Sequence, residues 1–344
     1  MLKIEFNESR RPRNKTYSRI RTRIITRIMA AATSTTKRVN ISISNVAPLI
    51  GLDHYNNFPR ILCELWRRYD PEGFRSFEIR MKEQGIRKLA NSSEMNDIWE
   101  IDDTHGTNIL EQVKKINNDK EKTSGDMVKL QEIVIKELDK IGTMAVDVKM
   151  ATAQKICSIT NKMHGVNNED NILEEFCRLS EKTISNTQGW VEIPLVKDGD
   201  NIEFVIVGKY DAITSDGELV EAKMRQKGLF KKMRDYENIQ VQLYLHALEY
   251  EHGYLIEGYK KTSSKNAKND KSGGEMQTYL HEINRDDYYI SEVILDRLKK
   301  LTTFFKVFIQ NEGMKETIIQ NDPNRKIYNL YITEYLELES GIDM

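Results

Sequence analysis

The change of hydrophobic period at Gln188 restricts the fold of this chain more than any other feature. Before it, apolar residues recur every three or four positions, as they do on amphipathic helices. After it they alternate, as they do on strands, within residues 189–196, 202–214 and 218–223. The turn-forming sequences DGD and SDG separate these three segments. The pattern predicts a three-stranded antiparallel meander.

Helical and strand patterns on both sides of the meander indicate the fold class. Upstream, Ser44 is a suitable N-cap for a short helix that ends at Gly51, a loop covers 53–59, and a second helix runs through 61–66. The elements expected downstream are a helix, a hairpin tip, a strand and an amphipathic helix, over residues 237–249, 262–275, 276–283 and 287–310. This order predicts an α/β or α+β domain in which helices flank a sheet.

The chain divides into three parts by composition. Residues 1–37 form a basic, arginine-rich tail, 38–315 form the main domain, and 316–344 form a C-terminal extension. Within the main domain, residues 71–150 are dense in charged residues with helical periodicity, which predicts a helical insertion. The tail is typical of a segment that grips nucleic acid or targets an organelle. A solvated extension, or translation from Met29, explains it equally well.

Overall charge and cysteine content exclude several classes of protein. The 52 basic and 53 acidic residues nearly cancel, so any surface that binds nucleic acid must be local. The three cysteines lie far apart, which speaks against disulfides, zinc and iron–sulfur sites and indicates a reducing compartment. No run of about 18 apolar residues occurs, so we expect no membrane span. The sequence also lacks a phosphate-binding loop of the G-x-x-x-x-G-K-[ST] type and histidines at metal-ligand spacing.

Asp211, Glu221 and Lys223 form the constellation that carries chemistry. Glu221 and Lys223 are two residues apart on the third strand, so their side chains leave the same face, about 6.6 Å apart along the strand. A hairpin turn brings Asp211, at the end of the preceding strand, beside Glu221. Two carboxylates this close repel each other and need a cation. Mg²⁺ fits, because it prefers oxygen ligands, and the Ala222 carbonyl can supply one more.

A metal ion at this position predicts hydrolysis of a phosphate ester. It lowers the pKa of a bound water and neutralises charge on the phosphodiester, while Lys223 orients the water or stabilises the transition state. A surface salt bridge is the simpler interpretation of an isolated Glu-x-Lys. Glu221-Ala222-Lys223 is, however, the only Glu-x-Lys in the chain, and it follows an acid on a paired strand.

These residues resemble the core of the PD-(D/E)XK nuclease superfamily, in which an acid precedes a (D/E)-x-K strand and a helix with a glutamine follows. GKYDAIT supplies Asp211, LVEAK supplies Glu221 and Lys223, and NIQVQLYLHAL supplies Gln240 one turn before Tyr244. The resemblance implies a restriction-endonuclease-like core with a central mixed sheet flanked by helices. It also implies that Asp211 and Glu221 bind metal, that Lys223 assists the attacking water, and that Gln240 positions these groups.

A helix before the meander resembles lambda-type phage exonucleases and YqaJ-like viral recombinases. In MHGVNNEDNILEEFCRL, Glu169 follows Gly165 at the spacing where this family adds one more carboxylate to the metal site. Glu174 and Glu175 are competing acids on the same helix, and their simpler interpretation is solvated charge. The resemblance therefore adds Glu169 to the candidate catalytic residues and metal ligands.

The segment ISISNVAPLIGLDHYNNFPRILCELW is similar to the opening of YqaJ proteins, through Ser44, Gly51, Tyr55 and Trp66. In lambda-type exonucleases a basic residue upstream of this serine contacts the 5′-terminal phosphate, and a helix N-terminus is suited to hold a phosphate. The resemblance implies that substrate is bound by Lys37 or Arg38 with Ser44 and Tyr55. The family's Arg-x-Gly spacing before the serine is absent here.

A run of basic residues follows the third strand and is a second candidate for substrate binding. Two aromatic residues, Phe230 and Tyr236, are interleaved with it. Such a segment can track a phosphate backbone, although a solvated basic loop is the simpler interpretation. The residues proposed to bind substrate here are Arg225, Lys227, Lys231 and Lys232.

The resemblance implies a Mg²⁺-dependent exonuclease, with Mn²⁺ as an alternative ion, that digests double-stranded DNA ends with 5′–3′ polarity in viral or phage recombination, repair or genome processing. An endonuclease or an RNA-degrading relative uses the same centre. A non-catalytic nucleic-acid-binding protein, and an RNA-associated or organellar protein defined by its basic tail, are alternatives from other classes. Besides DNA, a single-strand annealing protein and further copies of this chain are candidate partners. The expected location is intracellular: host cytoplasm or nucleus for a viral protein, or an organelle if the tail targets one.

Overall fold

The structure is a computed structural model that describes residues 37–84, 109, 111, 124–140, 146–197, 202–260 and 276–338. The basic tail as far as residue 36 and the expected hairpin tip at 262–275 lie outside the described residues. Within them, helices and strands alternate in a mixed α/β fold, as the sequence predicts. None of the described helices is both long enough and apolar enough to cross a membrane.

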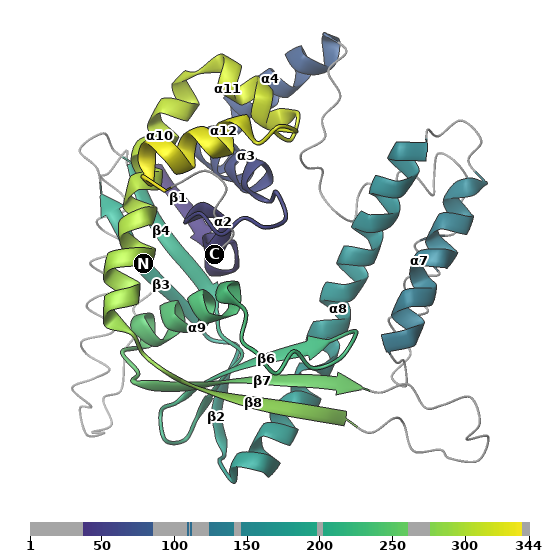
Figure 1. Ribbon diagram of the computed structural model, residues 1–344, viewed down its shortest axis with the longest axis vertical. Coiled ribbons are helices and arrows are strands. Elements are labelled where there is room, and N and C mark those ends of the chain that lie inside the picture. The colour runs from purple at the N-terminus through teal and green to yellow at the C-terminus, as the bar shows by residue number, and fades with distance from the viewer. Residues whose placement is uncertain are drawn as a thin grey trace, which may run out of the picture.

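The described strands form two mixed sheets (Figure 1). In the first, β1 (Lys37–Ser42) runs parallel to β4 (Ile202–Lys209), which is antiparallel to β3 (Trp190–Lys197). The second has the order β2–β5–β6–β7–β8, with β6 and β7 parallel and the other neighbours antiparallel. The bounds of β2, β5, β6, β7 and β8 are Ile184–Thr187, Ala212–Thr214, Leu219–Arg225, His252–Lys260 and Met276–Asn284.

The expected meander is present, but its middle strand breaks at Asp211. Residues 202–209 pair with β3 in the first sheet, whereas 212–214 pair with β6 in the second. The neighbouring chain bends at the same level, where Gln188 has a φ of 60° and its N–H donates to the Asp211 carbonyl at 2.9 Å. The prediction of one continuous strand over 202–214 is therefore wrong. The chain passes from one sheet to the other at Asp211.

Strands β1 and β7 are not among the elements expected from the sequence. In β1, Val39 and Ile41 are buried and alternate with polar residues, a pattern that is short and lies close to the basic tail. In β7, consecutive residues such as Leu255 and Ile256 are both fully buried, because helices cover both faces of the sheet there. A run that is buried on both faces has no alternation by which to recognise it.

The bounds of the helices agree well with the sequence, with one correction. The N-cap role expected for Ser44 is wrong, because Ser44 lies inside the short 3₁₀ segment η1 (Ile43–Asn45), and Asn45 precedes α2. The remaining helical elements are α2 (Val46–Leu49), α3 (Phe58–Tyr69), α4 (Pro71–Glu83), α7 (Ser124–Asp139), α8 (Val146–Ser180), α9 (Asp235–Leu248), η2 (Tyr289–Leu295), α10 (Asp296–Gln310), α11 (Glu312–Ile319), α12 (Lys326–Leu330) and η3 (Tyr331–Tyr335).

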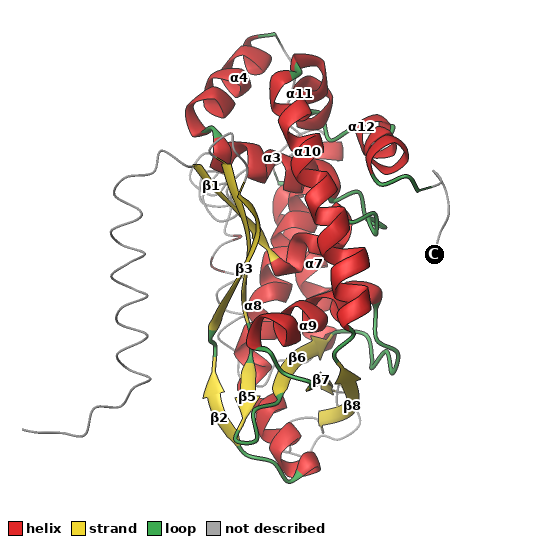
Figure 2. Ribbon diagram, turned by 90° about the vertical axis from the view of Figure 1, so that its left-hand side faces the viewer, coloured by secondary structure: helices red, strands yellow, loops and turns green. Residues whose placement is uncertain are grey.

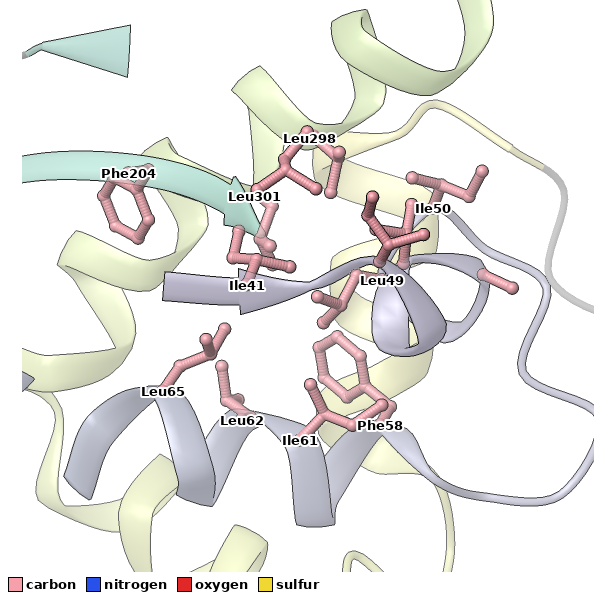
Figure 3. Packing of buried hydrophobic residues seen from close by; sticks show 14 of the residues in the cluster. Ile41, Leu49, Ile50, Phe58, Ile61, Leu62, Leu65, Phe204, Leu298 and Leu301 are labelled. Atoms are coloured by element: carbon pink, nitrogen blue, oxygen red, sulfur yellow. The ribbon is translucent and has the colours of Figure 1, made fainter. Parts of the chain in front are cut away.

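The main core lies between the first sheet and the helices α2, α3, α9 and α10. Figure 3 shows Ile41 of β1 and Phe204 of β4 facing α3 and α10 across this core. The region after residue 315 also contributes, since Tyr331 packs on Phe58 with ring centroids 5.2 Å apart and donates to the Leu49 carbonyl at 2.6 Å. Phe74 of α4 is buried in the same cluster. The proposed domain limits at 71–150 and 316–344 stay predictions.

A smaller core joins α8 to the second sheet. Ile172 and Phe176 of α8 are buried against Ala212, Val220 and Ile256. Helix α9 packs on the opposite face of this sheet, while α7 lies alongside the N-terminal half of α8 (Figure 1). The two faces of β6 are therefore covered by different helices. Side chains of α8 and of α9 therefore reach this sheet from opposite faces.

Candidate metal centre and nuclease site

Asp211 is held at the crossing between the sheets by hydrogen bonds to two neighbouring segments. Its Oδ2 accepts a hydrogen bond from the backbone N–H of Ala222 at 2.8 Å. Its carbonyl accepts from the N–H of Gln188. The carboxylate of Asp211 is thus fixed next to strand β6, although it belongs to a bend and not to the hairpin strand that the sequence predicts.

Glu221 and Lys223 share the face of β6 that is turned towards α9. Val220, before Glu221, and Ala222, between Glu221 and Lys223, pack towards α8 on the other face. This follows from the two-residue period of a strand. The Lys223 Nζ lies 2.7 Å from Oε1 of Glu221 and donates to Oε1 of Gln240 at 3.2 Å. The spacing argument from sequence therefore gives the observed arrangement of the two side chains.

Gln240 on α9 ties this pair to the helix. Its Nε2 donates to Oε1 of Glu221 at 2.7 Å, so Gln240 contacts both Glu221 and Lys223. Tyr244, one turn later, lies 3.4 Å from the same Nε2 and donates to the Lys209 carbonyl at 2.8 Å. A continuous set of hydrogen bonds therefore joins α9, β6 and the end of β4 around the candidate centre.

Glu169 approaches the centre from α8 on the other side. Its carboxylate accepts a hydrogen bond from the Gln188 side chain, at the bend beside Asp211. Burial raises the pKa of Glu169 to about 7, and the nearby Asp211 carboxylate adds to this effect. Glu169 thus lies within electrostatic reach of Asp211 and Glu221, at the edge of the group, and its part as a third metal ligand stays a prediction.

The carboxyl groups of this centre are unfavourable in their charged form without a counter-ion. Burial raises the pKa of Asp211, and it raises that of Glu221 to about 8 even though the Lys223 ammonium acts in the opposite direction. Burial alone would lower the pKa of Lys223, but the carboxylates of Glu221 and Asp211 outweigh it and raise that pKa. Lys223 therefore stays charged at neutral pH.

Glu221 has a buried oxygen that fits the Mg²⁺ expected from sequence. Its Oε2 is inaccessible to solvent and has no hydrogen-bond partner among the described residues, whereas Oε1 is bonded to Lys223 and Gln240. A buried carboxylate oxygen without a partner is costly, and a hard cation would satisfy it. Within the described ranges, no three acidic, histidine or cysteine side chains already stand as a metal-ligand cluster. The chemistry of the oxygen donors fits, and Asp211 and Glu221 are the residues placed to hold the ion.

The residues expected at a 5′-phosphate pocket do not come together. Because β1 is parallel to β4, its C-terminal end and Ser44 lie at the Asp211 end of the sheet, whereas Lys37 and Arg38 lie at the other end, roughly 20 Å along the strand. Arg38 forms an ion pair with Glu192 at 2.8 Å. The pairing of Lys37 or Arg38 with Ser44 is therefore corrected. Ser44 and Tyr55 are both exposed; Tyr55 lies on the loop before α3.

The basic segment after β6 divides into a buried and an exposed part. Arg225 is only 7% exposed; Glu237 binds its guanidinium at 2.6 and 3.1 Å, and Glu257 lies 3.2 Å away. Its place among substrate-binding residues is corrected, because its donors serve buried carboxylates. The other basic residues proposed from this segment remain candidates, because they are exposed on the loop before α9: Lys227, Lys231 and Lys232.

Three residues near the centre were not singled out as site residues from the sequence. Gln188 contacts Glu169, Lys209 is exposed two residues before Asp211, and Trp190 is 70% exposed at the start of β3. None of them belongs to a recognisable pattern. The one clue in the sequence is that Gln188 and Trp190 stand where the hydrophobic period changes, which marks the start of the sheet region.

Comparison with known proteins gives a distant likeness of structure. No family model matches this chain, and no curated protein matches it. An alkaline exonuclease from Laribacter hongkongensis aligns with a TM-score of 0.33 and 13% identity, over 54% of this chain and 82% of that protein. The same Laribacter exonuclease in complex with dAMP aligns with a TM-score of 0.33 and 14% identity, over 49% of this chain and 87% of that protein. A phage-related exonuclease from Haemophilus somnus 129PT aligns with a TM-score of 0.32 and 13% identity, over 44% of this chain and 72% of that protein.

Proposed function

We propose that this protein is a Mg²⁺-dependent nuclease that hydrolyses phosphodiester bonds at the ends of duplex DNA. The observation that carries the proposal is the buried Oε2 of Glu221, which has no partner while Asp211 and the charged Lys223 lie beside it. A purely structural ion pair would use both carboxylate oxygens or expose one to water. The sequence resemblance to lambda-type exonucleases supports DNA ends as the substrate.

Each side chain of the centre has a distinct chemical part in this proposal. Asp211 and Glu221 hold the ion, which supplies Lewis acidity to activate water and to neutralise charge on the phosphate. Because Lys223 stays charged, it donates a hydrogen bond to the nucleophile or to the phosphate oxygens and does not accept a proton. Gln240 fixes the relative positions of Lys223 and Glu221 through a hydrogen bond to each. Glu169 adds a third carboxylate from α8.

A panel of substrates tests the proposal. Purified full-length protein is incubated with linear duplex DNA, covalently closed circular DNA and RNA, each with Mg²⁺ or with EDTA. We expect mononucleotides to be released from the linear duplex in Mg²⁺ only, with the circular DNA intact. Cleavage of the circle would instead assign an endonuclease, and preference for RNA would assign a ribonuclease. Binding without any cleavage would show that the protein is not an enzyme.

A further inference from the structure

An exposed tryptophan lies two residues after Gln188, whose side chain contacts Glu169 of the candidate metal centre. Trp190 is 70% exposed at the start of β3, whereas Trp66 is buried in the main core. Large aromatic side chains usually bury most of their surface, so an exposed one next to a functional site suggests a ligand that stacks on it. The site beside Trp190 is proposed to act on nucleic acid, whose bases offer flat apolar faces.

Lys209 adds a positive charge to the same surface. Trp190 and Lys209 are directly paired across β3 and β4, so both side chains project from the same face of the sheet. Lys209 is exposed and lies two residues before Asp211. Its ammonium acts to lower the pKa of Glu169 and Asp211, against the larger effect of burial, so it lies within electrostatic reach of both carboxylates.

The bend before β3 fixes the position of Trp190. The Tyr210 N–H donates to the Gly189 carbonyl at 3.0 Å, and the Gln188 N–H donates to the Asp211 carbonyl at 2.9 Å. A Cβ on Gly189 would lie 2.0 Å from the Tyr210 hydroxyl, so glycine is needed for this contact. Gln188 takes up a left-handed φ of 60°, which a non-glycine residue adopts at a cost. Trp190 is thus held rigidly relative to Asp211.

An ion pair offsets the charge of the acid nearest to Trp190 on this face of β3. Glu192 is the next residue of β3 on the Trp190 face, and its charge is balanced by Arg38 at 2.8 Å. The helices α9 and α10 pack on the other face of the sheet, to the right of β3 in Figure 2. Among the described residues, these helices therefore leave the Trp190 side uncovered, and Lys209 lies at its edge within reach of the Glu169 and Asp211 carboxylates.

We propose that Trp190 and Lys209 form a subsite for an unpaired nucleotide adjacent to the scissile phosphate. The indole stacks on the base, and the Lys209 ammonium contacts a backbone phosphate. Stacking recognises any base, so this subsite holds single-stranded nucleic acid without reading its sequence. The inference rests on the proposed function for its choice of ligand, and it adds a requirement that the strand be locally unpaired at the site.

Tryptophan fluorescence with a short oligothymidylate tests the subsite directly. The full-length protein is titrated in Ca²⁺ instead of Mg²⁺, which separates binding from cleavage. The chain has three tryptophans, so the Trp190→Phe variant gives the background of the other two. We expect quenching at saturation in the wild type and its loss in Trp190→Phe, which keeps an affinity close to wild type because phenylalanine also stacks.

Affinities of further variants complete the test. We expect Trp190→Ala to bind the oligonucleotide roughly 10- to 100-fold more weakly. Lys209→Ala should lower the slope of log affinity against log salt by about 0.7, as loss of one phosphate contact to a single strand requires. Tyr288→Ala is the matched control, since Tyr288 is 74% exposed and lies after β8, outside this surface. Thermal melting confirms that each variant is folded.

Three results of these binding titrations would overturn the inference. They are unchanged affinity of Trp190→Ala, unchanged Trp190 emission at saturation, and absence of oligonucleotide binding by the wild type. A shift in oligomeric state on Trp190→Ala, with DNA binding intact, would assign the surface to protein contact and also overturn it. Because binding in Ca²⁺ is measured without cleavage, an inactive enzyme that still shows Trp190 quenching would remove the proposed function and leave the subsite.

Discussion

The substitution Glu221→Gln should stabilise the metal-free protein while destroying its response to Mg²⁺. Glu221 holds its proton more tightly in the folded chain, where burial raises its pKa from 4.5 to about 8. Its contribution to stability is therefore fully present below pH 4.5 and is lost as the pH rises to about 8. The free energy of unfolding falls by about 1.4 kcal/mol for each pH unit above 4.5, the pKa of the group in the unfolded chain. At pH 7 the loss of stability is therefore on the order of 3 kcal/mol.

Glutamine removes this cost and keeps the local hydrogen bonds. Its amide oxygen can still accept from Lys223 and Gln240, which bond only to Oε1 of Glu221 in the structure. The loss of attraction to the Lys223 ammonium, and the burial of amide N–H donors where Oε2 has no partner among the described residues, offset part of the gain. We expect a net stabilisation of about 1–2 kcal/mol, or a rise in Tm of about 2–4 °C in EDTA.

Differential scanning calorimetry at pH 7, with EDTA and with Mg²⁺, gives the measurement. Mg²⁺ at about 100 times its Kd should stabilise the wild type by about 2.7 kcal/mol and the variant much less. The difference between the two Tm values therefore becomes smaller in Mg²⁺ than in EDTA, or changes sign. Glu174→Gln is the control, because Glu174 is an exposed acid on α8 and should change neither value. A lower Tm of Glu221→Gln in EDTA, or equal stabilisation of both proteins by Mg²⁺, would refute the reasoning.

Three further predictions concern residues around the centre. Arg225→Ala should destabilise the fold by about 3–5 kcal/mol, because it removes the guanidinium that binds the buried carboxylates of Glu237 and Glu257. Urea unfolding measures this, and an unchanged midpoint contradicts it. Burial acts to raise the pKa of Glu257, but hydrogen bonds from His281, Arg225 and the Phe230 N–H outweigh it and lower that pKa. The stability that Glu257 contributes is therefore present above about pH 4.5 and lost at lower pH. Acid unfolding of Glu257→Gln should lack this component; a profile parallel to wild type would contradict the assignment. Gln188→Ala should raise the Mg²⁺ concentration needed for half-maximal cleavage roughly 10-fold, because Gln188 positions Glu169, and the Tm should stay unchanged. An unchanged Mg²⁺ requirement would contradict this and leave Gln188 with a structural role alone.

The local geometry of the centre could be predicted because it follows from short-range rules. The two-residue period of a strand puts Glu221 and Lys223 on one face whatever the rest of the fold does. One helical turn separates Gln240 from Tyr244, and the structure shows both in the same hydrogen-bonded set. These relations need no knowledge of the tertiary structure, and the structure reproduces them.

The remaining features depend on partners that are distant in sequence. Arg225 looks like one more exposed basic residue until Glu257, which lies 32 residues later on β7, is seen beside it. Lys37 and Ser44 are seven residues apart, but an extended β1 separates them, and the sequence did not reveal that strand. The break at Asp211 likewise depends on Gln188 and Gly189 in the neighbouring chain, whose contacts no local pattern announces.

The rate of Mg²⁺-dependent nucleotide release from end-labelled linear duplex DNA, measured for the wild type and Lys223→Ala side by side, tests the central claim most directly. Lys223 donates within the candidate centre to Glu221 and Gln240, and its charge is proposed to act on the reacting phosphate. The account predicts a loss of about 100-fold or more in kcat, with Glu174→Gln fully active and with thermal melting showing that Lys223→Ala is still folded at the assay temperature. Cleavage by Lys223→Ala at the wild-type rate, or no cleavage by the wild type in Mg²⁺, would contradict it.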